Sequence, residues 1–247
     1  MSKAPRPLAL ERILQSQGFG SRKACRQLIL AGAVRVDGTL CDEPDAAFVP
    51  TTDLRLGVEE AEWPWREHLY LALNKPAGYE CSHTPQHHRS VFSLLPEHFV
   101  TRGVQCAGRL DADTTGLLLL SDDGPWLHAL SSPRRHVPKT YRVFAKHAVD
   151  DAQVAALLAG VQLHDEPAPL AALSCRQVEE KVLELEIDQG KYHQVKRMVA
   201  AAGNRVEQLH RVAVGALVLG DGLLSGLAEG AWCEIESVAV RMGRDVA

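Results

Sequence analysis

The stretch CAGRLDADTTGLLLLSDDG, from Cys106 to Gly124, places four consecutive leucines between two groups of aspartates. The leucines lie between Gly116 and the turn signal Asp122-Asp123-Gly124, in a run that is too short for a helix and typical of a buried β-strand. Three interpretations fit the acidic ends of this strand: a calcium loop, an acidic turn, or the seat of one catalytic carboxylate. The interpretation of the whole chain depends on which one holds.

A calcium loop is the first interpretation to test. Its first, third, fifth, sixth and twelfth positions would be Asp111, Asp113, Thr115, Gly116 and Asp122. The twelfth position of such a loop normally carries a bidentate glutamate, and the seventh to tenth positions here are all leucine. The flanking segments do not continue as long amphipathic helices. These departures argue against calcium, and no other metal site is predicted.

The aspartates then divide between two roles. Asp122 and Asp123 precede a glycine and fit a turn. Asp111 follows AGRL and precedes TTG, where an acid either caps the turn or is held ionised at a cleft by a nearby cation. Spacing alone leaves this choice open. The candidate cations are Arg109, Lys196 and Arg197.

Working outward from this strand, the chain mixes strands and helices without regular βαβ alternation. Alternating or continuous apolar patterns predict strands, and apolar residues at i, i+3, i+4 and i+7 predict helices. The absence of βαβ alternation predicts an α+β fold with a mixed or antiparallel sheet. The predicted strands are 69–74, 139–145 and 181–187, and the predicted helices are 125–132, 149–160 and 192–204.

The first 40 residues predict a smaller unit of two helices and a hairpin. Leu10, Ile13 and Leu14 have helical spacing, and Ser21 is a good N-cap for a second helix that ends at Gly32. The hairpin at 33–40 turns on Asp37-Gly38. The second helix carries three basic residues, which suit either a solvated face or RNA phosphates: Arg22, Lys23 and Arg26.

Charge is distributed unevenly along the chain. The net charge is −4, yet residues 1–40 sum to +5 and residues 41–65 to −6. The acidic stretch to Glu62 is predicted to be a connector, with a domain boundary near residues 60–66. Two later stretches, 132–146 and 190–198, are basic again. Local basic faces matter more for phosphate binding than the total charge does.

Composition places the chain among ordinary globular proteins, at 247 residues with 46% hydrophobic and 23% charged residues. No apolar run approaches the ~20 residues that span a bilayer, and the first residues lack the apolar core of a secretory signal. The six cysteines form no C-x-x-C pair. We therefore expect a cytoplasmic protein with reduced thiols.

Several stretches together resemble one family. GRLDADTTGLLLLSDDG is similar to the signature of the pseudouridine synthases, in the branch that modifies ribosomal RNA. Four further stretches resemble the same branch, and HQVKRM and the segment around KTY most resemble its RsuA-type enzymes of the small subunit. The first 40 residues resemble a small RNA-binding domain shared with a ribosomal small-subunit protein and bacterial tyrosyl-tRNA synthetases. The further stretches are 71–82, 131–144, 160–166 and 190–211.

The resemblance implies a domain organisation. Residues 1–60 would be the RNA-binding domain with an acidic linker, and residues 66–247 the pseudouridine synthase catalytic domain. A basic domain on a tether would add affinity for the RNA. The implied partner is ribosomal RNA or a small-subunit assembly particle, and a monomer is the simplest expectation.

The resemblance also implies a reaction and its residues. Uridine in RNA is isomerised to pseudouridine, with no group added or lost, so no cofactor or metal is required. Asp111 matches the catalytic aspartate, and Tyr141 matches a tyrosine that stacks on the flipped-out base. Lys196 aligns with a basic residue beside the acid, although many relatives have arginine, which leaves Arg197 open for that place. Arg197 is otherwise expected to bind RNA. Arg109 is expected to fill the gap left by the base or to bind phosphate.

Three other functions compete with this interpretation. A synthase for large-subunit 23S rRNA would share most of these motifs. A non-catalytic RNA-binding or ribosome-assembly factor would keep the scaffold, but this chain retains Asp111, Tyr141 and the basic helix. A glycosidic hydrolase would want a second carboxylate, and no clearly paired acid is found beyond Asp113 and the turn aspartates.

Overall fold

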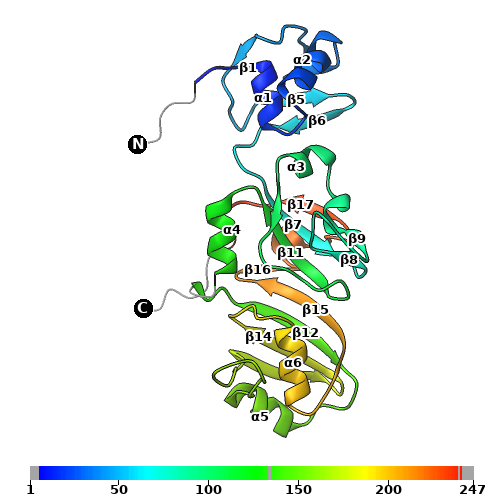
Figure 1. The fold of residues 1–247 in the computed structure, drawn as a ribbon, viewed down its shortest axis with the longest axis vertical. Helices are drawn as coiled ribbons and strands as arrows, with labels where there is room; N and C mark the ends of the chain where they lie inside the picture. The colour runs from blue at the N-terminus through cyan, green and yellow to red at the C-terminus, as the bar shows by residue number, and fades with distance from the viewer. Residues whose placement is uncertain (1–5, 133–134, 239, 241–247) are drawn as a thin grey trace. The chain divides into compact units, whose positions relative to one another are not determined.

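The computed structural model describes residues 6–132, 135–238 and 240, drawn in colour in Figure 1. Pro133 and Arg134, from the first of the later basic stretches, lie outside the described residues. The chain divides into two compact units. Of the described residues, the first unit contains those up to Leu69 together with Leu95–Val104, and the second contains Tyr70–Leu94 together with those from Gln105 onward.

The first unit begins with the two predicted helices and the predicted hairpin. Its first helix, α1 (Leu10–Ser16), follows the short strand β1 (Leu8–Ala9), and α2 (Arg22–Leu30) starts where the Ser21 hydroxyl accepts a hydrogen bond from the Ala24 N–H. Strands β2 (Val34–Val36) and β3 (Thr39–Leu40) pair antiparallel through the Asp37-Gly38 turn. These local predictions are confirmed.

The acidic stretch is not a connector, contrary to the prediction. It contains three strands: β4 (Ala47–Phe48), β5 (Arg55–Val58) and β6 (Ala61–Pro64). Strands β5 and β6 extend the hairpin into a four-stranded sheet of order β3-β2-β5-β6. The acids lie at turns and on exposed positions, whereas Leu56 and Val58 alternate into the core. The high negative charge of residues 41–65 drew attention away from this alternating apolar pattern, which is typical of a strand.

A segment from the middle of the chain also belongs to the first unit. Helix α3 (Glu97–Thr101) brings the His98 ring onto the Phe19 ring, with centroids 4.6 Å apart. Burial lowers the pKa of His98 to about 4. By contacts, the division between the units falls after Leu69, a few residues beyond the boundary expected from composition.

The second unit is built on one mixed sheet with the order β13-β14-β12-β15-β11-β7-β17. The leucine run is the interior strand β11 (Thr115–Ser121), and its four leucines are fully buried, as predicted. It pairs antiparallel with β7 (Tyr70–Lys75) and parallel with β15 (Val206–Val214). The remaining strands are β8 (Tyr79–Glu80), β9 (Arg89–Ser90), β10 (Gln105–Cys106), β12 (Lys139–Ala145), β13 (Ser174–Glu179), β14 (Val182–Ile187), β16 (Leu217–Val218) and β17 (Trp232–Glu234).

The predicted helices of this unit are present. They are α4 (Gly124–Ser131), α5 (Asp151–Ala159) and α6 (Gln194–Ala201), and α6 packs against β15 and α5. Helix α6 begins two residues later than predicted because His193 has left-handed backbone angles, with φ 47°. Two 3-10 turns, η1 (Val91–Leu94) and η3 (Gly222–Leu224), complete the described elements. The α+β prediction is confirmed, and no helix in the described ranges is long and apolar enough to cross a membrane.

Candidate active site

The loop that carries Asp111 is held by hydrogen bonds from a buried lysine, Lys75. Asp111 lies between β10 and β11, and its carbonyl accepts a hydrogen bond from the Thr114 N–H. The ammonium group of Lys75, which is fully buried, donates to the carbonyls of Pro76, Ala112 and Thr114 at 3.0, 3.2 and 2.8 Å. Burial lowers the pKa of Lys75. These bonds fix the backbone that follows Asp111 and tie it to the segment after β7.

Gly116 is required where this loop enters β11. Its φ is +100°, and a Cβ at this position would lie 2.3 Å from the carbonyl oxygen of Arg211 on β15. An L side chain would therefore clash with the neighbouring strand and adopt unfavourable backbone angles. The glycine lets β11 and β15 approach closely at the start of β11, where the Asp111 loop ends.

The Asp111 carboxylate meets two basic side chains from the start of α6. Lys196 Nζ lies 3.0 Å from Asp111 Oδ2, and His193 Nε2 lies 3.2 Å from Asp111 Oδ1. Lys196 also binds Asp113, with Nζ 2.7 Å from Oδ1 and 2.9 Å from Oδ2. Two carboxylates thus share one ammonium group.

The shared ion pair stabilises its charged forms. Burial acts to lower the pKa of Lys196, but the hydrogen bonds that it donates to Asp113 and Asp111 outweigh burial and raise it. Burial acts to raise the pKa of Asp113, and the hydrogen bond from Lys196 outweighs that effect and lowers it. Lys196 is therefore a cation, and Asp113 an anion, at neutral pH.

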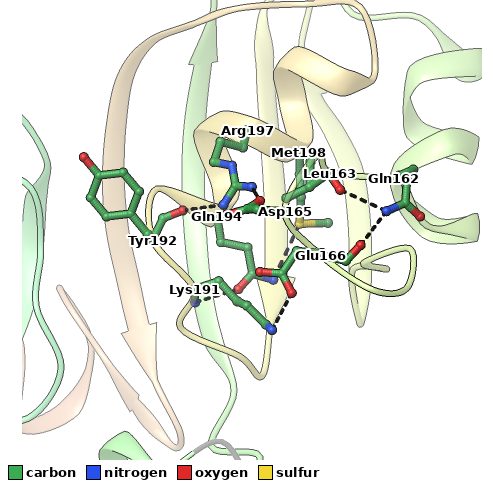
Figure 2. A network of polar contacts seen from close by, with 9 residues as sticks. All are labelled: Gln162, Leu163, Asp165, Glu166, Lys191, Tyr192, Gln194, Arg197 and Met198. Atoms are coloured by element: carbon green, nitrogen blue, oxygen red, sulfur yellow. Dashed lines mark hydrogen bonds and ion pairs between the residues drawn. The ribbon is translucent and has the colours of Figure 1, made fainter.

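Arg197, the alternative partner for Asp111, points elsewhere. Figure 2 shows its guanidinium between Asp165 and the backbone of Tyr192. It forms an ion pair with Asp165, and its Nη1 donates to the Tyr192 carbonyl at 3.1 Å. Of the two basic residues that the sequence left open, Lys196 is the one in contact with Asp111.

A cavity of about 230 Å³ opens beside Asp111. Tyr141 lines it from β12, and Arg109, which is exposed, lines it from the Asp111 loop. The cavity therefore brings together three of the predicted site residues, Asp111, Tyr141 and Lys196, and places Arg109 beside them. Its dimensions and mixed polar lining suit one nucleoside-sized group.

Two buried cations in this cavity were missed by the sequence interpretation. Lys139 lies on the same face of β12 as Tyr141, and its ammonium group donates to the Val137 carbonyl at 2.9 Å. Arg211 is 1% exposed and donates to the Leu117 carbonyl at 2.7 Å and to the Tyr141 hydroxyl at 3.5 Å. The sequence did carry a signal for them, because a basic residue at a core position of an alternating strand is unusual and indicates a functional role.

The three basic residues predicted to bind RNA in the first unit differ in their surroundings. Arg22 and Arg26 both pair with the buried carboxylate of Glu11, and Arg26 also lies 3.3 Å from Asp45. These bonds lower the pKa of Glu11. Lys23 is exposed. Both arginines keep about half of their side-chain surface exposed, so each can hold the fold and still offer positive charge.

The aspartates after the leucine run behave as a turn. The Asp123 side chain accepts from the Trp126 N–H and caps α4, and it also accepts from the Tyr70 hydroxyl at 2.7 Å. The extended strand β11 separates this turn from Asp111. Because the two acidic ends lie at opposite ends of a strand, they cannot close around one calcium ion.

Two cysteines lie beside the Asp111 loop. Cys81 Sγ accepts a hydrogen bond from the Leu110 N–H at 3.5 Å, and Cys106 donates its thiol proton toward Cys81. This hydrogen bond, with the charges of Lys75 and Arg211, lowers the pKa of Cys81 to about 6 and leaves Cys106 protonated. All six cysteines are free thiols.

Comparisons with known proteins identify two domain types in the chain. The family model described as RNA pseudouridylate synthase matches residues 69–201, and the S4 domain model matches residues 10–46. A solved structure titled "Crystal structure of pseudouridylate synthase" covers 95% of this chain and 99% of its own, at 32% identity and a TM-score of 0.65.

Curated relatives give the same result. A protein from Yersinia pestis named ribosomal small subunit pseudouridine synthase A is 37% identical over 89% of this chain and 92% of its own length. A protein of the same name from Salmonella typhimurium is 47% identical over 64% of this chain and 68% of its own. The chain is thus an enzyme with an N-terminal S4 domain, and it belongs to the RNA pseudouridylate synthase family.

Proposed function

We propose that this enzyme isomerises a specific uridine to pseudouridine in small-subunit 16S ribosomal RNA, with Asp111 as its catalytic carboxylate. The observation that carries the proposal is the pairing of Asp111 with Lys196 and His193 at a nucleoside-sized cavity lined by Tyr141. The names of the relatives from Yersinia pestis and Salmonella typhimurium support the choice of substrate.

Asp111 acts where the bond between the ribose anomeric carbon and uracil N1 breaks. As that bond lengthens, positive charge develops on the sugar, and a carboxylate on one face stabilises or captures it. Uracil leaves with the bonding electrons, turns over, and rejoins the same carbon through its C5. The C5 proton is then lost and N1 gains a proton, so the product is an isomer of the substrate.

The cavity supplies the surroundings that this reaction needs. Tyr141 offers an aromatic face to the flipped-out uracil. The detached uracil is anionic, and the positive charges of Lys139 and Arg211 in the same cavity oppose the cost of that charge in a partly enclosed site. Arg109, exposed on the Asp111 loop, is placed to contact a phosphate or to fill the gap left by the base.

The S4 domain supplies affinity that one nucleotide pocket cannot. We propose that residues 1–60 bind RNA through Arg22, Lys23 and Arg26 and that residues 66–247 carry the chemistry. A second binding domain on the same chain raises the effective concentration of the RNA at the pocket. Because β6 extends to Pro64 and pairs with β5, a truncation that tests this division should begin at residue 66.

The proposal is tested by mapping pseudouridine in cells that lack the protein. Both ribosomal RNAs are treated with carbodiimide and examined by primer extension, after rescue with wild type, Asp111→Asn or the control Asp151→Asn. Asp151 is an acid in the first turn of α5 that does not line the cavity. We expect one small-subunit site to vanish and to return with wild type and the control, but not with Asp111→Asn.

The other outcomes identify the competing functions. Loss of large-subunit sites would move the substrate to 23S rRNA. A map unchanged by deletion would contradict the proposal and favour an RNA-binding assembly factor. Release of free uracil from the purified RNA, without pseudouridine, would indicate a glycosidic hydrolase, whose reaction needs an attacking water.

A further inference from the structure

Tyr192 is the most exposed of the large apolar side chains in the described part of the chain, at 76%. Its ring stacks on the His193 ring, with centroids 3.8 Å apart and planes 19° apart. His193 in turn reaches the Asp111 carboxylate through Nε2 at 3.2 Å. An aromatic stack therefore runs from open solvent to the side of the carboxylate.

The segment that carries this stack is held in place on both sides. Figure 2 shows the Tyr192 ring pointing away from a network that fixes the neighbouring residues. The Tyr192 carbonyl is bound by Arg197, which is itself paired with Asp165. Lys191 pairs with Glu166 at 2.6 Å, so the residue before the tyrosine is also anchored.

The conformation of His193 adds to this picture. Its φ of 47° is uncommon for a residue with a side chain, and such angles persist where the surroundings determine them. Here they direct the imidazole between Tyr192 and Asp111. A rigid, exposed aromatic face loses little conformational entropy when it binds a partner.

We propose that Tyr192 is a stacking site for the base of an RNA nucleotide adjacent to the target uridine. Flipping the uridine leaves its neighbours unstacked, and aromatic faces are the usual supports for unstacked bases. The inference rests on the proposed function and deepens it, because it assigns a place to the nucleotide next to the one that reacts. The residues beside Tyr192 are Lys191 and His193, a polar setting that suits RNA better than an apolar protein surface.

The test uses the full-length enzyme and a small-subunit RNA fragment that contains the mapped uridine. Tyr192→Ala removes the ring, Tyr192→Phe keeps it, and Leu223→Ala is a control that truncates another exposed apolar side chain, which is not in the cavity lining. We expect Tyr192→Ala to lower kcat/KM by roughly tenfold, and Tyr192→Phe and Leu223→Ala to stay within about twofold of wild type. Unchanged melting temperatures would exclude a folding defect.

Modified fragments identify the stacked base. Each carries an abasic ribonucleotide on the 5′ or the 3′ side of the target. With the wild-type enzyme, one of the two abasic fragments should have a kcat/KM roughly tenfold below that of the unmodified fragment. With Tyr192→Ala, the same abasic fragment should cause no further decrease in kcat/KM. If the abasic fragment lowers the kcat/KM of Tyr192→Ala by the same factor as that of wild type, the stacking site is wrong. A Tyr192→Ala enzyme as active as wild type would also overturn it.

The stacking site and the proposed function fail in different ways. If wild type converts the uridine and Tyr192→Ala does so equally well, the stacking site is wrong and the proposed function stands. If wild type converts no small-subunit uridine, both are wrong. If Tyr192→Ala is impaired on ribosomal particles but not on the naked fragment, the tyrosine contacts a protein, which also overturns a base-stacking role.

Discussion

The ammonium group of Lys196 lies 3.0 Å from the carboxylate of Asp111 and binds Asp113 at the same time. A single cation between two acids keeps a negative charge available in a partly enclosed site, where a lone carboxylate would be costly. The two carboxylates differ in their surroundings, because the Asp113 side chain is 73% exposed and that of Asp111 is 32% exposed. Their roles can therefore be separated by mutation.

Lys196→Met should lower kcat by roughly a hundredfold and change KM little, because the cation holds the carboxylate and does not grip the RNA. Lys196→Arg should recover part of the loss, since a guanidinium also pairs with a carboxylate. Steady-state kinetics on the small-subunit fragment measure both. Lys181→Met, at an exposed lysine, controls for lost charge. A Lys196→Met enzyme with normal kcat would show that Asp111 needs no cation.

Asp113→Asn should change kcat by less than about threefold, whereas Asp111→Asn should abolish turnover. The reason is that Asp113 contacts Lys196 from the solvent side and only shares its charge. The comparison is made on one RNA preparation, with each variant checked by circular dichroism. Equal losses from the two substitutions would point to a pair of catalytic acids and so to hydrolase-like chemistry.

Lys139 should make stability depend on pH. Burial, and next the charge of Arg211, lower its pKa from 10.5 to about 8. Below pH 8 Lys139 is protonated in both the folded and the unfolded protein, and burying its charge destabilises the folded state. Between pH 8 and 10.5 Lys139 is neutral in the folded protein but still protonated in the unfolded protein, so the free energy of unfolding rises with pH. Lys139→Met should therefore unfold with a larger free energy at pH 7, by on the order of 3 kcal/mol.

Denaturant titrations from pH 7 to 10 give that comparison. The advantage of Lys139→Met should shrink steadily above pH 8, and the variant should be less active because its cavity has lost a cation. A constant difference across the range would mean that the ammonium group is already neutral, or well solvated, in the folded protein.

Cys81 should react as a thiolate near neutral pH. The hydrogen bond from Cys106 lowers its pKa to about 6, whereas burial raises the pKa of Cys175 to about 11. Iodoacetamide labelling followed by peptide mass spectrometry should give a midpoint near pH 6 for Cys81 and little labelling of Cys175. In Cys106→Ala the Cys81 midpoint should move upward; an unmoved midpoint would exclude the thiol pair as the cause.

Arg197 and Asp165 should act as one unit. If their ion pair holds the segment around Tyr192, then Arg197→Met and Asp165→Asn each lower kcat/KM, and the double variant is no worse than either. A direct phosphate contact by Arg197 predicts the opposite: Asp165→Asn would leave affinity intact or improve it, and Arg197→Met would reduce the salt dependence of binding by about one charge. Arg205→Met is a control at an exposed arginine.

Sequence patterns predicted the elements but not all of their uses. The leucine run, the Ser21 cap and the Asp37-Gly38 turn are local signals, and each is present in the structure. The sheet strands within 41–65 were missed because acidic residues at turns hid two alternating apolar positions.

The site shows the same division between local and long-range information. The resemblance predicted roles for Asp111 and Tyr141. The choice of Lys196 over Arg197 as the partner of Asp111 depends on the left-handed turn at His193 and on Asp165, more than 30 residues earlier. Lys139 and Arg211 were missed because a core position in an alternating strand predicts an apolar side chain. The roles of these residues depend on contacts between segments that are far apart in the sequence, and such contacts cannot be predicted from the pattern of a single sequence.

Lys75 grips its loop entirely through main-chain carbonyls, and the Ala112 carbonyl also receives the Gly78 N–H at 2.8 Å. Both hydrogen bonds to residue 112 are made to its main-chain carbonyl, so neither depends on its side chain. The position directly after Asp111 is therefore open to change by natural drift or by an engineer, because the backbone alone sets the geometry of the Asp111 carboxylate. A saturation library at residue 112 should yield many active enzymes, and one at Lys75 very few.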